Sequence, residues 1–254
     1  MTRAHDALVD RQFGPQAQAY VQSAVHAEGA DLDLILQLAT RAAPRRALDL
    51  GTGGGHVAYR LAQAADEVVA CDLSKEMLAA VEAEAAKRGL SNLRVVQAPA
   101  ERLPCEDGAF GFLACRFSAH HWRDLDQGLA EARRVAAPGA TAVFVDGTSV
   151  GGALFDTHLQ AIELLRDPSH VRDYSPAEWS AALARAGFRL DAMHGWRLRM
   201  DFSSWVARMR APPLAVEAIR ALQDGASAEV RDHFAIEPDG SFQLDVLMLQ
   251  ATAA

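Results

Sequence analysis

The chain has few cysteines, and none of them has the spacing of a metal site or a redox pair. Three cysteines occur in 254 residues, and no two of them form a C-x-x-C pair; they are Cys71, Cys105 and Cys115. This usage is typical of reduced thiols in a cytosol. The nine histidines contain neither an H-x-x-x-H nor an H-E-x-x-H pattern, so we predict no metal site.

Basic residues and long apolar runs are also scarce. Lys and Arg number 25 against 33 Asp and Glu, which gives a formal net charge of −8. This balance argues against a nucleic-acid partner. No apolar run has membrane length, and the N-terminus lacks the apolar core of a signal peptide. We therefore expect a cytoplasmic protein with no membrane partner, and the oligomeric state stays open.

The most informative segment is a glycine-rich turn that follows a short apolar strand. The strand 47–50 carries Asp49, and the turn after it contains Gly51, Gly53 and Gly55. Glycine has no Cβ, so such a turn can adopt positive φ and let a ligand lie against bare backbone. A second apolar strand, 67–71, is followed by Asp72. Strand, glycine turn, helix, strand and acid form the layout of a nucleoside pocket, with the acid placed to bind ribose hydroxyls.

Details of the turn decide between nucleoside cofactors. Dinucleotide folds use G-x-G-x-x-G, whose third glycine allows close helix packing. Here the spacing is G-x-G-x-G, and His56 stands where the third Rossmann glycine would be. Asp49 would also repel a pyrophosphate, whereas it suits a cofactor with an ammonium group. The D-x-G-x-G form resembles motif I of the class I S-adenosylmethionine-dependent methyltransferases.

The resemblance continues along the chain. Residues 72–78 are similar to the D-x-S-x-x-M-L turn of the small-molecule group called type 11 methyltransferases. Residues 100–104 resemble their A-E-x-L-P loop, and residues 131–139 resemble their E-x-x-R-V-L-x-P-G-G helix and turn. Residues 116–122, RFSAHHW, resemble a narrower bacterial subset. The resemblance implies S-adenosyl-L-methionine as cofactor and methyl transfer to the O, N or C atom of a small organic acceptor.

The pattern of elements predicts an α/β fold. Half of the residues are hydrophobic and 23% are charged, and no linker or repeat interrupts the chain, so we expect one domain over residues 1–254. Repeated βα units predict a parallel sheet with helices on both faces. We expect a Rossmann-like, doubly wound, mostly parallel seven-stranded sheet with an antiparallel C-terminal strand. The predicted strands are 47–50, 67–71, 93–97, 110–115, 140–146 and 188–196.

Outside the predicted cofactor-binding core, 45–146, the chain is less regular. Residues 1–30 are expected to form N-terminal cover helices, and the inserts 147–175 and 201–233 are expected to cover the substrate. The Asp239-Gly240 pair predicts a turn between strands 234–236 and 242–249, which would close the chain as a β-hairpin. The aromatic and apolar residues of the cover segments indicate a moderately hydrophobic acceptor.

The resemblance assigns the cofactor contacts residue by residue. Asp72 would bind the ribose diol, and Gly51 and Gly53 would line the methionine portion with backbone. Asp49 would hold the methionyl ammonium, or alternatively cap a helix. Leu73 would pack on the adenine face or in the core.

The adenine edge departs from the pattern of many relatives. Ala100 would meet the ring through its backbone N–H. An acid often precedes that alanine in relatives, but this chain has Pro99. Glu101 or a backbone carbonyl would then accept the adenine amine. Gly111 is a second departure, where many relatives have Asp in strand four.

The predicted catalytic residues lie in the segment after the fourth predicted strand, 110–115. His120 and His121 lie where the methyl group should point, and an imidazole near its normal pKa suits a general base; alternatively one ring packs beside Trp122. Arg116 would offer its backbone carbonyl to the cofactor ammonium, leaving its side chain free for an acidic acceptor. Tyr20 would close over the cofactor, or be an ordinary core tyrosine.

Three functions follow from these observations. The first is a methyltransferase for a small organic acceptor. The second is an NAD(P)-dependent oxidoreductase, which the missing third glycine and Asp49 disfavour. The third is a non-catalytic S-adenosylmethionine-binding protein, because cofactor binding and methyl transfer are separable.

Overall fold

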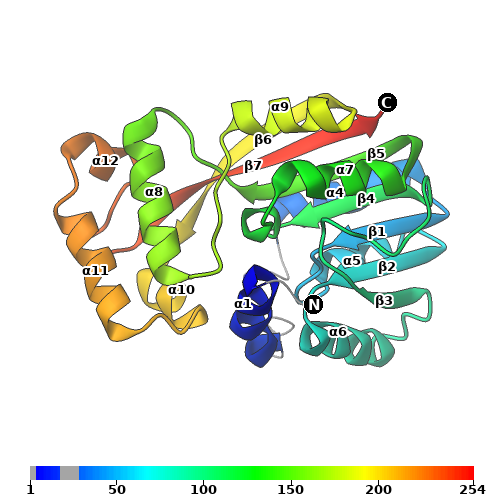
Figure 1. Ribbon diagram of the computed structural model, residues 1–254, viewed down its shortest axis with the longest axis horizontal. Helices are drawn as coiled ribbons and strands as arrows, with labels where there is room; N and C mark the ends of the chain where they lie inside the picture. The colour runs from blue at the N-terminus through cyan, green and yellow to red at the C-terminus, as the bar shows by residue number, and fades with distance from the viewer. Residues whose placement is uncertain (1–3, 18–28) are drawn as a thin grey trace.

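A seven-stranded sheet forms the centre of the molecule in the computed structural model, which describes residues 4–17 and 29–254 (Figure 1). The strand order is β3-β2-β1-β4-β5-β7-β6. The strands are β1 (Arg46–Leu50), β2 (Glu67–Asp72), β3 (Leu93–Gln97), β4 (Phe110–Arg116), β5 (Ala136–Gly147), β6 (Phe188–Met200) and β7 (Phe242–Ala253). Neighbours among β1–β5 pair in parallel, while β7 pairs antiparallel with both β5 and β6. The predicted Rossmann-like sheet with an antiparallel C-terminal strand is confirmed.

Helices cover both faces of this sheet. The helices of the core are α4 (Ala30–Ala42), α5 (His56–Leu61), α6 (Lys75–Lys87), α7 (Leu125–Val135) and α9 (Pro176–Ala186). Side chains of α4, α5 and α6 join one apolar cluster, and side chains of α7 and α9 join another. The pleat of β1 explains this division, because Ala47 belongs to the first cluster and Leu48 to the second. Asp49, next along the strand, therefore points toward the face that α5 covers.

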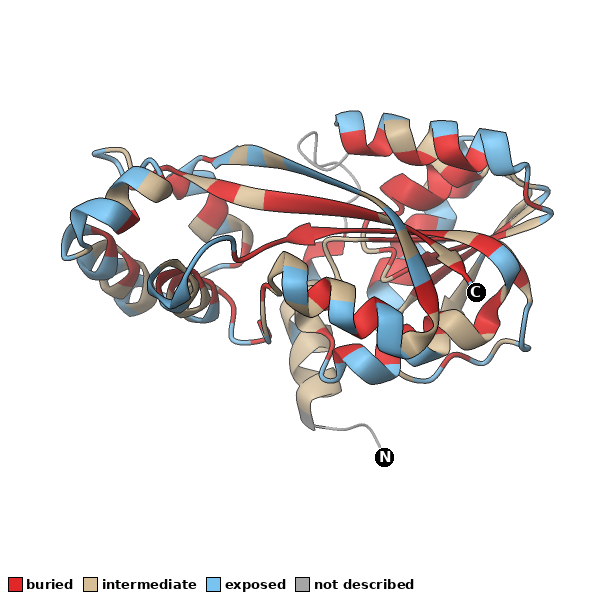
Figure 2. Cartoon of the chain, turned by 90° about the horizontal axis from the view of Figure 1, so that it is seen from above, coloured by how far each residue is buried: buried red, intermediate tan, exposed pale blue. Residues whose placement is uncertain are grey.

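β6 and β7 continue beyond the core as a long two-stranded ribbon. In Figure 1 they reach leftward to a group of helices away from β1–β4. These helices are α8 (Ala153–Arg166), α10 (Phe202–Arg208), α11 (Pro213–Asp224) and α12 (Ala228–His233). Seen from above (Figure 2), β7 is buried over most of its length, whereas most of β6 and the outer faces of these helices are intermediate or exposed. The apolar side of the ribbon is thus covered by the inserted segments.

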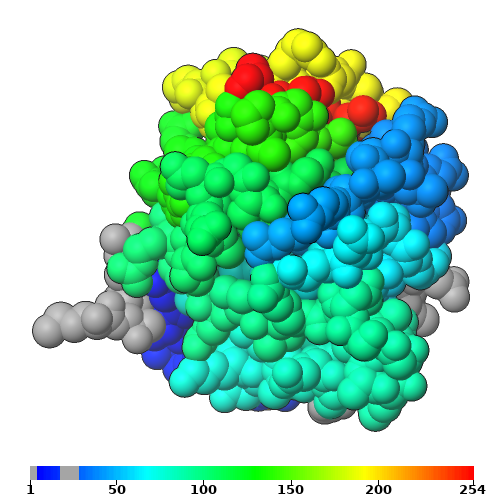
Figure 3. Space-filling view, turned by 90° about the vertical axis from the view of Figure 1, so that its right-hand side faces the viewer, coloured from blue at the N-terminus to red at the C-terminus, as the bar shows by residue number. Residues whose placement is uncertain are grey.

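The predicted C-terminal hairpin is wrong. The Asp239-Gly240 turn does form, since the N–H of Glu237 donates to the carbonyl of Ser241 at 2.8 Å. Residues 234–236, however, form the turn that ends α12, and β7 pairs with β6 from Met200–Phe242 to Phe188–Ala253. A ladder along thirteen residues of β6 satisfies many more backbone groups than a three-residue strand could. Viewed from the side in Figure 3, the C-terminal residues in red lie between the yellow and green segments that flank β7.

The N-terminal segment begins with α1 (Ala4–Phe13) and a 3-10 turn, η1 (Gly14–Gln16). In Figure 1, α1 lies between the core and the group of helices around the ribbon. None of the helices within residues 4–17 and 29–254 combines the length and the apolarity that crossing a bilayer requires.

Candidate functional site

A cavity of about 600 Å³ opens at the carboxyl ends of β1, β2 and β4. This is the point where the strand order reverses, between β1 and β4, and where ligands bind in open α/β sheets. One part, the glycine-loop end, is formed by the segments that follow β1, β2 and β3. The other part, the far end, is formed by residues of α8, β6, β7 and the turn after β4. The far end is lined by His120, Gly147, Glu163, Arg166, Asp173, Trp196, Leu198, Met200, Met209, Leu244 and Met248.

The glycine turn follows β1 as predicted, and its glycines are needed for two different reasons. Gly51, Gly53 and Gly55 all have positive φ, between 49° and 81°. A Cβ on Gly51 would overlap the Ser118 hydroxyl, whereas a Cβ on Gly53 would meet no atom within 4 Å. Gly51 is therefore required by packing inside the protein. Gly53 instead leaves bare backbone beside open space, which is what a bound ligand needs.

Asp49 is buried below this turn, with 1% of its surface exposed. Its Oδ2 accepts a hydrogen bond from the Thr52 hydroxyl at 2.6 Å and from the Ala58 N–H at 2.9 Å. The helix-capping alternative is thus part of its role, because Ala58 lies in the first turn of α5. Asp49 also lines the cavity. Burial raises its pKa to about 7, and the two hydrogen bonds only partly oppose that effect. A cationic group in the cavity would favour its ionised form.

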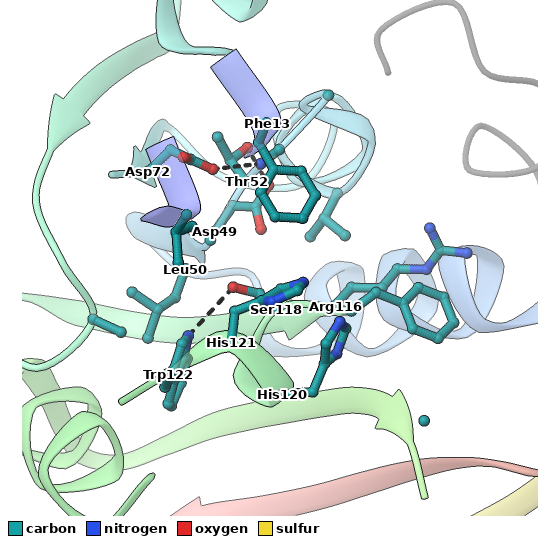
Figure 4. Close-up of a pocket in the computed structure, with 18 of the residues that line it drawn as sticks. Phe13, Asp49, Leu50, Thr52, Asp72, Arg116, Ser118, His120, His121 and Trp122 are labelled. Atoms are coloured by element: carbon teal, nitrogen blue, oxygen red, sulfur yellow. Dashed lines mark hydrogen bonds between the residues drawn. The ribbon is translucent and has the colours of Figure 1, made fainter. Parts of the chain in front are cut away.

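Asp72 ends β2 and holds the neighbouring backbone in place. Its Oδ2 accepts the N–H of Gly53 at 2.8 Å, and its Oδ1 accepts the N–H of Ser74 at 2.9 Å (Figure 4). Burial raises the pKa of Asp72, while these N–H groups lower it. The carboxylate is therefore fixed at the edge of the cavity by two backbone donors, in the position predicted for a ribose ligand.

The predicted adenine-side residues also line the cavity, but their side chains offer few polar groups. Leu73, Pro99, Ala100 and Glu101 all lie on its wall. The Oε1 of Glu101 accepts the N–H of Asp124 at 3.3 Å, so this carboxylate is anchored to the start of α7. A flat apolar ring would fit between Leu73 and Ala100.

Arg116 lies at the end of β4, as predicted, but its side chain is not free. The guanidinium forms a buried ion pair with Asp31 of α4 and lies over the ring of Phe117, 4.8 Å from its centroid. Only 8% of the Arg116 side chain is exposed. The prediction that this side chain awaits an acidic acceptor is therefore wrong, because the start of α4 supplies the carboxylate. Tyr20, the predicted aromatic cover, lies outside the described residues; Phe13 of α1 lines the cavity.

His120 is held by a carboxylate that the sequence predictions did not include. Its Nδ1 lies 2.5 Å from the Oδ1 of Asp146, and its backbone N–H donates to the Oδ2 of Asp146 at 3.1 Å. Burial by itself lowers the pKa of His120, but the charge of Asp146 and the hydrogen bond to it raise that pKa to about 9. A pKa of about 9 favours the imidazolium at neutral pH, which suits a hydrogen-bond donor better than the general base expected from the sequence.

His121 has the opposite electrostatic character. Its Nδ1 lies 3.1 Å from the carbonyl oxygen of Ser169, and its ring meets Phe13 edge-on with centroids 4.9 Å apart. Burial and the positive charge of His120 lower the pKa of His121 well below its ordinary value. It is a neutral ring packed between α1 and the segment after α8, and a weak base.

Several residues of the far end were missed because they come from distant segments. Asp146 could have been found, since it stands at the carboxyl end of a predicted strand, where functional side chains gather. Glu163, Arg166 and Asp173 come from α8 and the segment after it, where the sequence pattern predicts only a helix. Within the described part of the chain, one set of three potential metal ligands lies close together, namely His120, Asp146 and Asp173.

Known proteins resemble this chain over the core and beyond it. A family model described as a methyltransferase domain matches residues 48–144. YafE of Escherichia coli, an uncharacterised protein, is 42% identical over 204 residues, which cover 80% of this chain and 99% of that protein. YcgJ of Bacillus subtilis, an uncharacterised methyltransferase, is 33% identical over 88% of both chains. Its crystal structure aligns with a TM-score of 0.83 over 87% of this chain and 97% of its own.

A more distant relative has a stated substrate. The demethylmenaquinone methyltransferase of Thermus thermophilus is 39% identical over 113 residues, which cover 44% of this chain and 51% of that protein. Residues 48–144, which the family model matches, include the glycine turn and Asp72 at the end of β2. Bare backbone at Gly53 and two carboxylates at the carboxyl ends of β1 and β2 also fit S-adenosylmethionine. The chain belongs to the class I S-adenosylmethionine-dependent methyltransferases.

Proposed function

We propose that this protein transfers the methyl group of S-adenosylmethionine to a small organic acceptor with a moderately hydrophobic body. The observation that carries this proposal is the continuity of the cavity. Its glycine-loop end has the groups that the cofactor needs, and its far end combines apolar walls with buried ionisable side chains. The family assignment removes the NAD(P)-dependent oxidoreductase alternative, since that proposal rested on the same glycine turn.

At the glycine-loop end, the cofactor contacts follow from the positions described above. Asp72 would accept both ribose hydroxyls, and Asp49 would face the methionyl ammonium, directly or through water. Gly51 and Gly53 would contact the methionine portion through backbone. On the adenine side, Leu73 and Ala100 would pack on the ring, and Glu101 or a backbone carbonyl would accept its amine. The backbone carbonyl of Arg116 would offer a further acceptor to the ammonium.

At the far end, the acceptor would lie between apolar and charged walls. Trp196, Leu198 and Met200 of β6 face Met248 and Leu244 of β7 along the cavity. This apolar surface supports a hydrophobic acceptor body, as does the relative that acts on demethylmenaquinone. α1 and the inserts 147–175 and 201–233 would cover the acceptor, and they contribute wall residues such as Val9, Glu163 and Met209. The methylated atom is O, N or C.

The chemical step needs little beyond alignment and charge. The bound cofactor supplies an electrophilic methyl on a sulfonium, whose leaving group departs as a neutral thioether. Holding the acceptor in line with that methyl can therefore supply much of the rate enhancement. His120, as an imidazolium fixed by Asp146, would bind the acceptor oxygen in its anionic form and stabilise the negative charge, the acceptor having released its proton to solvent before the methyl group is transferred. His121 would position His120 and the acceptor rather than abstract a proton.

Calorimetric titration with S-adenosylmethionine and S-adenosylhomocysteine tests the cofactor half of this proposal. Wild-type protein is expected to bind both ligands. Asp72→Ala removes the carboxylate beside the ribose, and two lost charge-assisted hydrogen bonds should weaken binding about 100-fold. Glu82→Ala, an exposed acid on α6, is the matched control and should bind like wild type.

A second measurement tests catalysis. Wild-type protein with isotopically labelled S-adenosylmethionine is screened against phenols, hydroquinones, amines and carboxylic acids, and labelled products are detected by mass spectrometry. Tight binding of S-adenosylhomocysteine without a labelled product would favour the non-catalytic cofactor-binding alternative. Absence of any binding by wild-type protein would contradict the proposed function altogether.

A further inference from the structure

The segment between α8 and α9 wraps around the turn that carries His120 and His121. The N–H of Val171 donates to the carbonyl of His120 at 2.8 Å. The carbonyl of Ser169 lies 3.1 Å from the Nδ1 of His121. Four polar residues of this segment are buried; they are Asp167, Ser169, His170 and Asp173. This segment therefore forms a polar wall at the far end of the cavity.

Two buried carboxylates of that region, those of Asp146 and Asp173, differ in the number of hydrogen bonds that they accept. Asp146 accepts three N–H groups, from the ring of His120, the backbone of His120 and the backbone of Gly147. Asp173 is just as deeply buried, with 4% of its surface exposed, yet its Oδ2 has no hydrogen-bond partner. The Nε2 of His170 lies 3.9 Å from the Oδ2 of Asp173 but is bonded to Gln160 instead, and burial lowers the pKa of His170 to about 3.

Asp173 is nevertheless held rigidly in place. The side-chain amide of Gln160 donates to the carbonyl of Asp173 at 2.9 Å and accepts its N–H at 3.1 Å. Glycine at position 147 makes room for the carboxylate, because a Cβ there would lie 2.7 Å from the Oδ1 of Asp173. Asp173, whose Oδ2 is unsatisfied, is thus fixed among the residues that line the cavity.

A buried acceptor without a donor is costly, and native proteins keep few of them. When such a group is fixed in position beside a ligand cavity, the missing donor is best supplied by the ligand. We propose that Asp173 is a recognition residue of the acceptor site and binds a hydroxyl group of the acceptor within reach of His120. This proposal rests on the proposed function, because it assigns the chemistry of the acceptor in that same cavity.

The surroundings favour a hydroxyl over a metal ion. Ligand atoms of His120, Asp146 and Asp173 lie within 4.8 Å of one another, a spacing that a cation could also use. However, the oxygens of Asp146 are already occupied by N–H donors, and the ring nitrogen of His120 that bonds Asp146 is not available. The Oδ2 of Asp173 has no hydrogen-bond partner, and a single hydroxyl donor would satisfy it without a divalent cation.

The charge of Asp173 is compatible with this ligand in either state. Burial raises the pKa of Asp173, and the nearby carboxylate of Glu163 raises it further, while the positive charge of His120 opposes both. A hydroxyl group can donate to the carboxylate or accept from the carboxylic acid. An ether oxygen at the same position can only accept, and a carboxylate ligand would be repelled by the ionised form.

The experiment compares two probes of the same shape on the preformed cofactor-product complex. Wild-type protein is saturated with S-adenosylhomocysteine and titrated with catechol and with 1,2-dimethoxybenzene. When Asp173 is ionised, we expect catechol to bind at least about tenfold more tightly, as one hydrogen bond to a buried charged group would give. Asp173→Ala should abolish this preference, and Asp173→Asn should retain part of it. Asp66→Asn, the same change on an exposed residue, should behave like wild type.

A stability measurement separates recognition from structure. Because no hydrogen-bond partner is lost, the Tm of ligand-free Asp173→Asn should equal or exceed that of wild type, whereas a structural carboxylate would lower it. Equal binding of the two probes, no binding of catechol, or an unchanged preference in Asp173→Ala would overturn the proposal. So would stoichiometric Mn²⁺ binding that Asp173→Ala removes, which would make Asp173 a metal ligand. The proposed function fails separately, if S-adenosylhomocysteine itself does not bind.

Discussion

The two ends of the cavity are built in different ways. At the glycine-loop end, each functional carboxylate is fixed by donors from the β1–α5–β2 unit or the turn after it, as Asp72 is by the N–H groups of Gly53, 19 positions away, and Ser74, two positions away. At the far end, functional side chains are fixed by partners from remote segments. Asp146 lies 26 positions from His120, and Ser169 lies 48 positions from His121.

Because of this difference, the cofactor site can stay the same while the acceptor site changes. A strand, a turn and the start of a helix make a cofactor site that is complete once β1 and β2 pair. The far end instead takes many of its wall residues from β6, β7 and the inserted helices, which lie outside β1–β5, although β7 itself pairs with β5. The same cofactor chemistry can thus be combined with different acceptors.

Replacing His120 should have the largest effect on the rate of methyl transfer, and this effect should be confined to the far end of the cavity. His120→Ala removes the cation proposed to stabilise the acceptor oxygen, so kcat is expected to fall about 10²–10³-fold. Affinity for S-adenosylhomocysteine should stay unchanged, because the cofactor contacts lie at the glycine-loop end. Steady-state kinetics with an acceptor found in the screen, together with calorimetry, measure both quantities.

Asp146→Asn sharpens this prediction by altering the charge on His120 alone. Loss of the neighbouring carboxylate should lower the pKa of His120 from about 9 toward its ordinary value, which NMR titration of the imidazole can follow. If the measured pKa of His120 in wild-type protein is close to the ordinary histidine value, the imidazolium role is excluded, and His120 becomes a candidate general base again.

The two glycines of the turn should separate folding from binding at the glycine-loop end. Gly51→Ala forces a Cβ into the Ser118 hydroxyl at positive φ, so we expect the free energy of unfolding to fall by about 2–3 kcal/mol. Gly53→Ala meets no protein atom and should cost only about 1 kcal/mol from its positive φ. Its methyl group would occupy cofactor space, however, so affinity for S-adenosylhomocysteine should drop about tenfold. Chemical denaturation and calorimetry give both values, and equal losses of stability would contradict the assignment.

The glycine-loop end and the far end also differ in how much of each could be predicted from the sequence. The cofactor core is encoded by contiguous patterns, so the order of β1–β5 and the positions of Asp49 and Asp72 were predicted correctly. Local periodicity and turn residues suffice there, because each side chain acts within its own βα unit. β3 was predicted with the bounds that the structure has, Leu93–Gln97.

The errors concern contacts between segments that are far apart in the chain. Nothing local to Arg116 indicates Asp31, which lies 85 positions away and neutralises its charge. Likewise, the pKa of His120 depends on Asp146 and could not be read from residues 116–122. The turn of the predicted C-terminal hairpin does form, but β7 pairs with the longer strand β6 instead of with residues 234–236.

The smallest predicted effect concerns pH and tests whether Asp49 really faces the cofactor ammonium. Burial raises the pKa of Asp49 to about 7, so below that pH the carboxyl of the ligand-free protein holds a proton. Because the folded-state pKa of Asp49 lies above the model value of 3.8, the stability that this carboxyl contributes is fully present only below pH 3.8 and is lost as the pH rises to about 7. The ammonium prefers the carboxylate, so cofactor binding must release this proton. The affinity for S-adenosylhomocysteine should therefore weaken by up to about tenfold for each pH unit below 7.

Calorimetry in two buffers of different ionisation enthalpy would detect the proton released. Asp49→Asn should bind more weakly and show no such pH dependence; an unchanged slope in this variant would assign the proton to another group and leave Asp49 with only its role beneath α5.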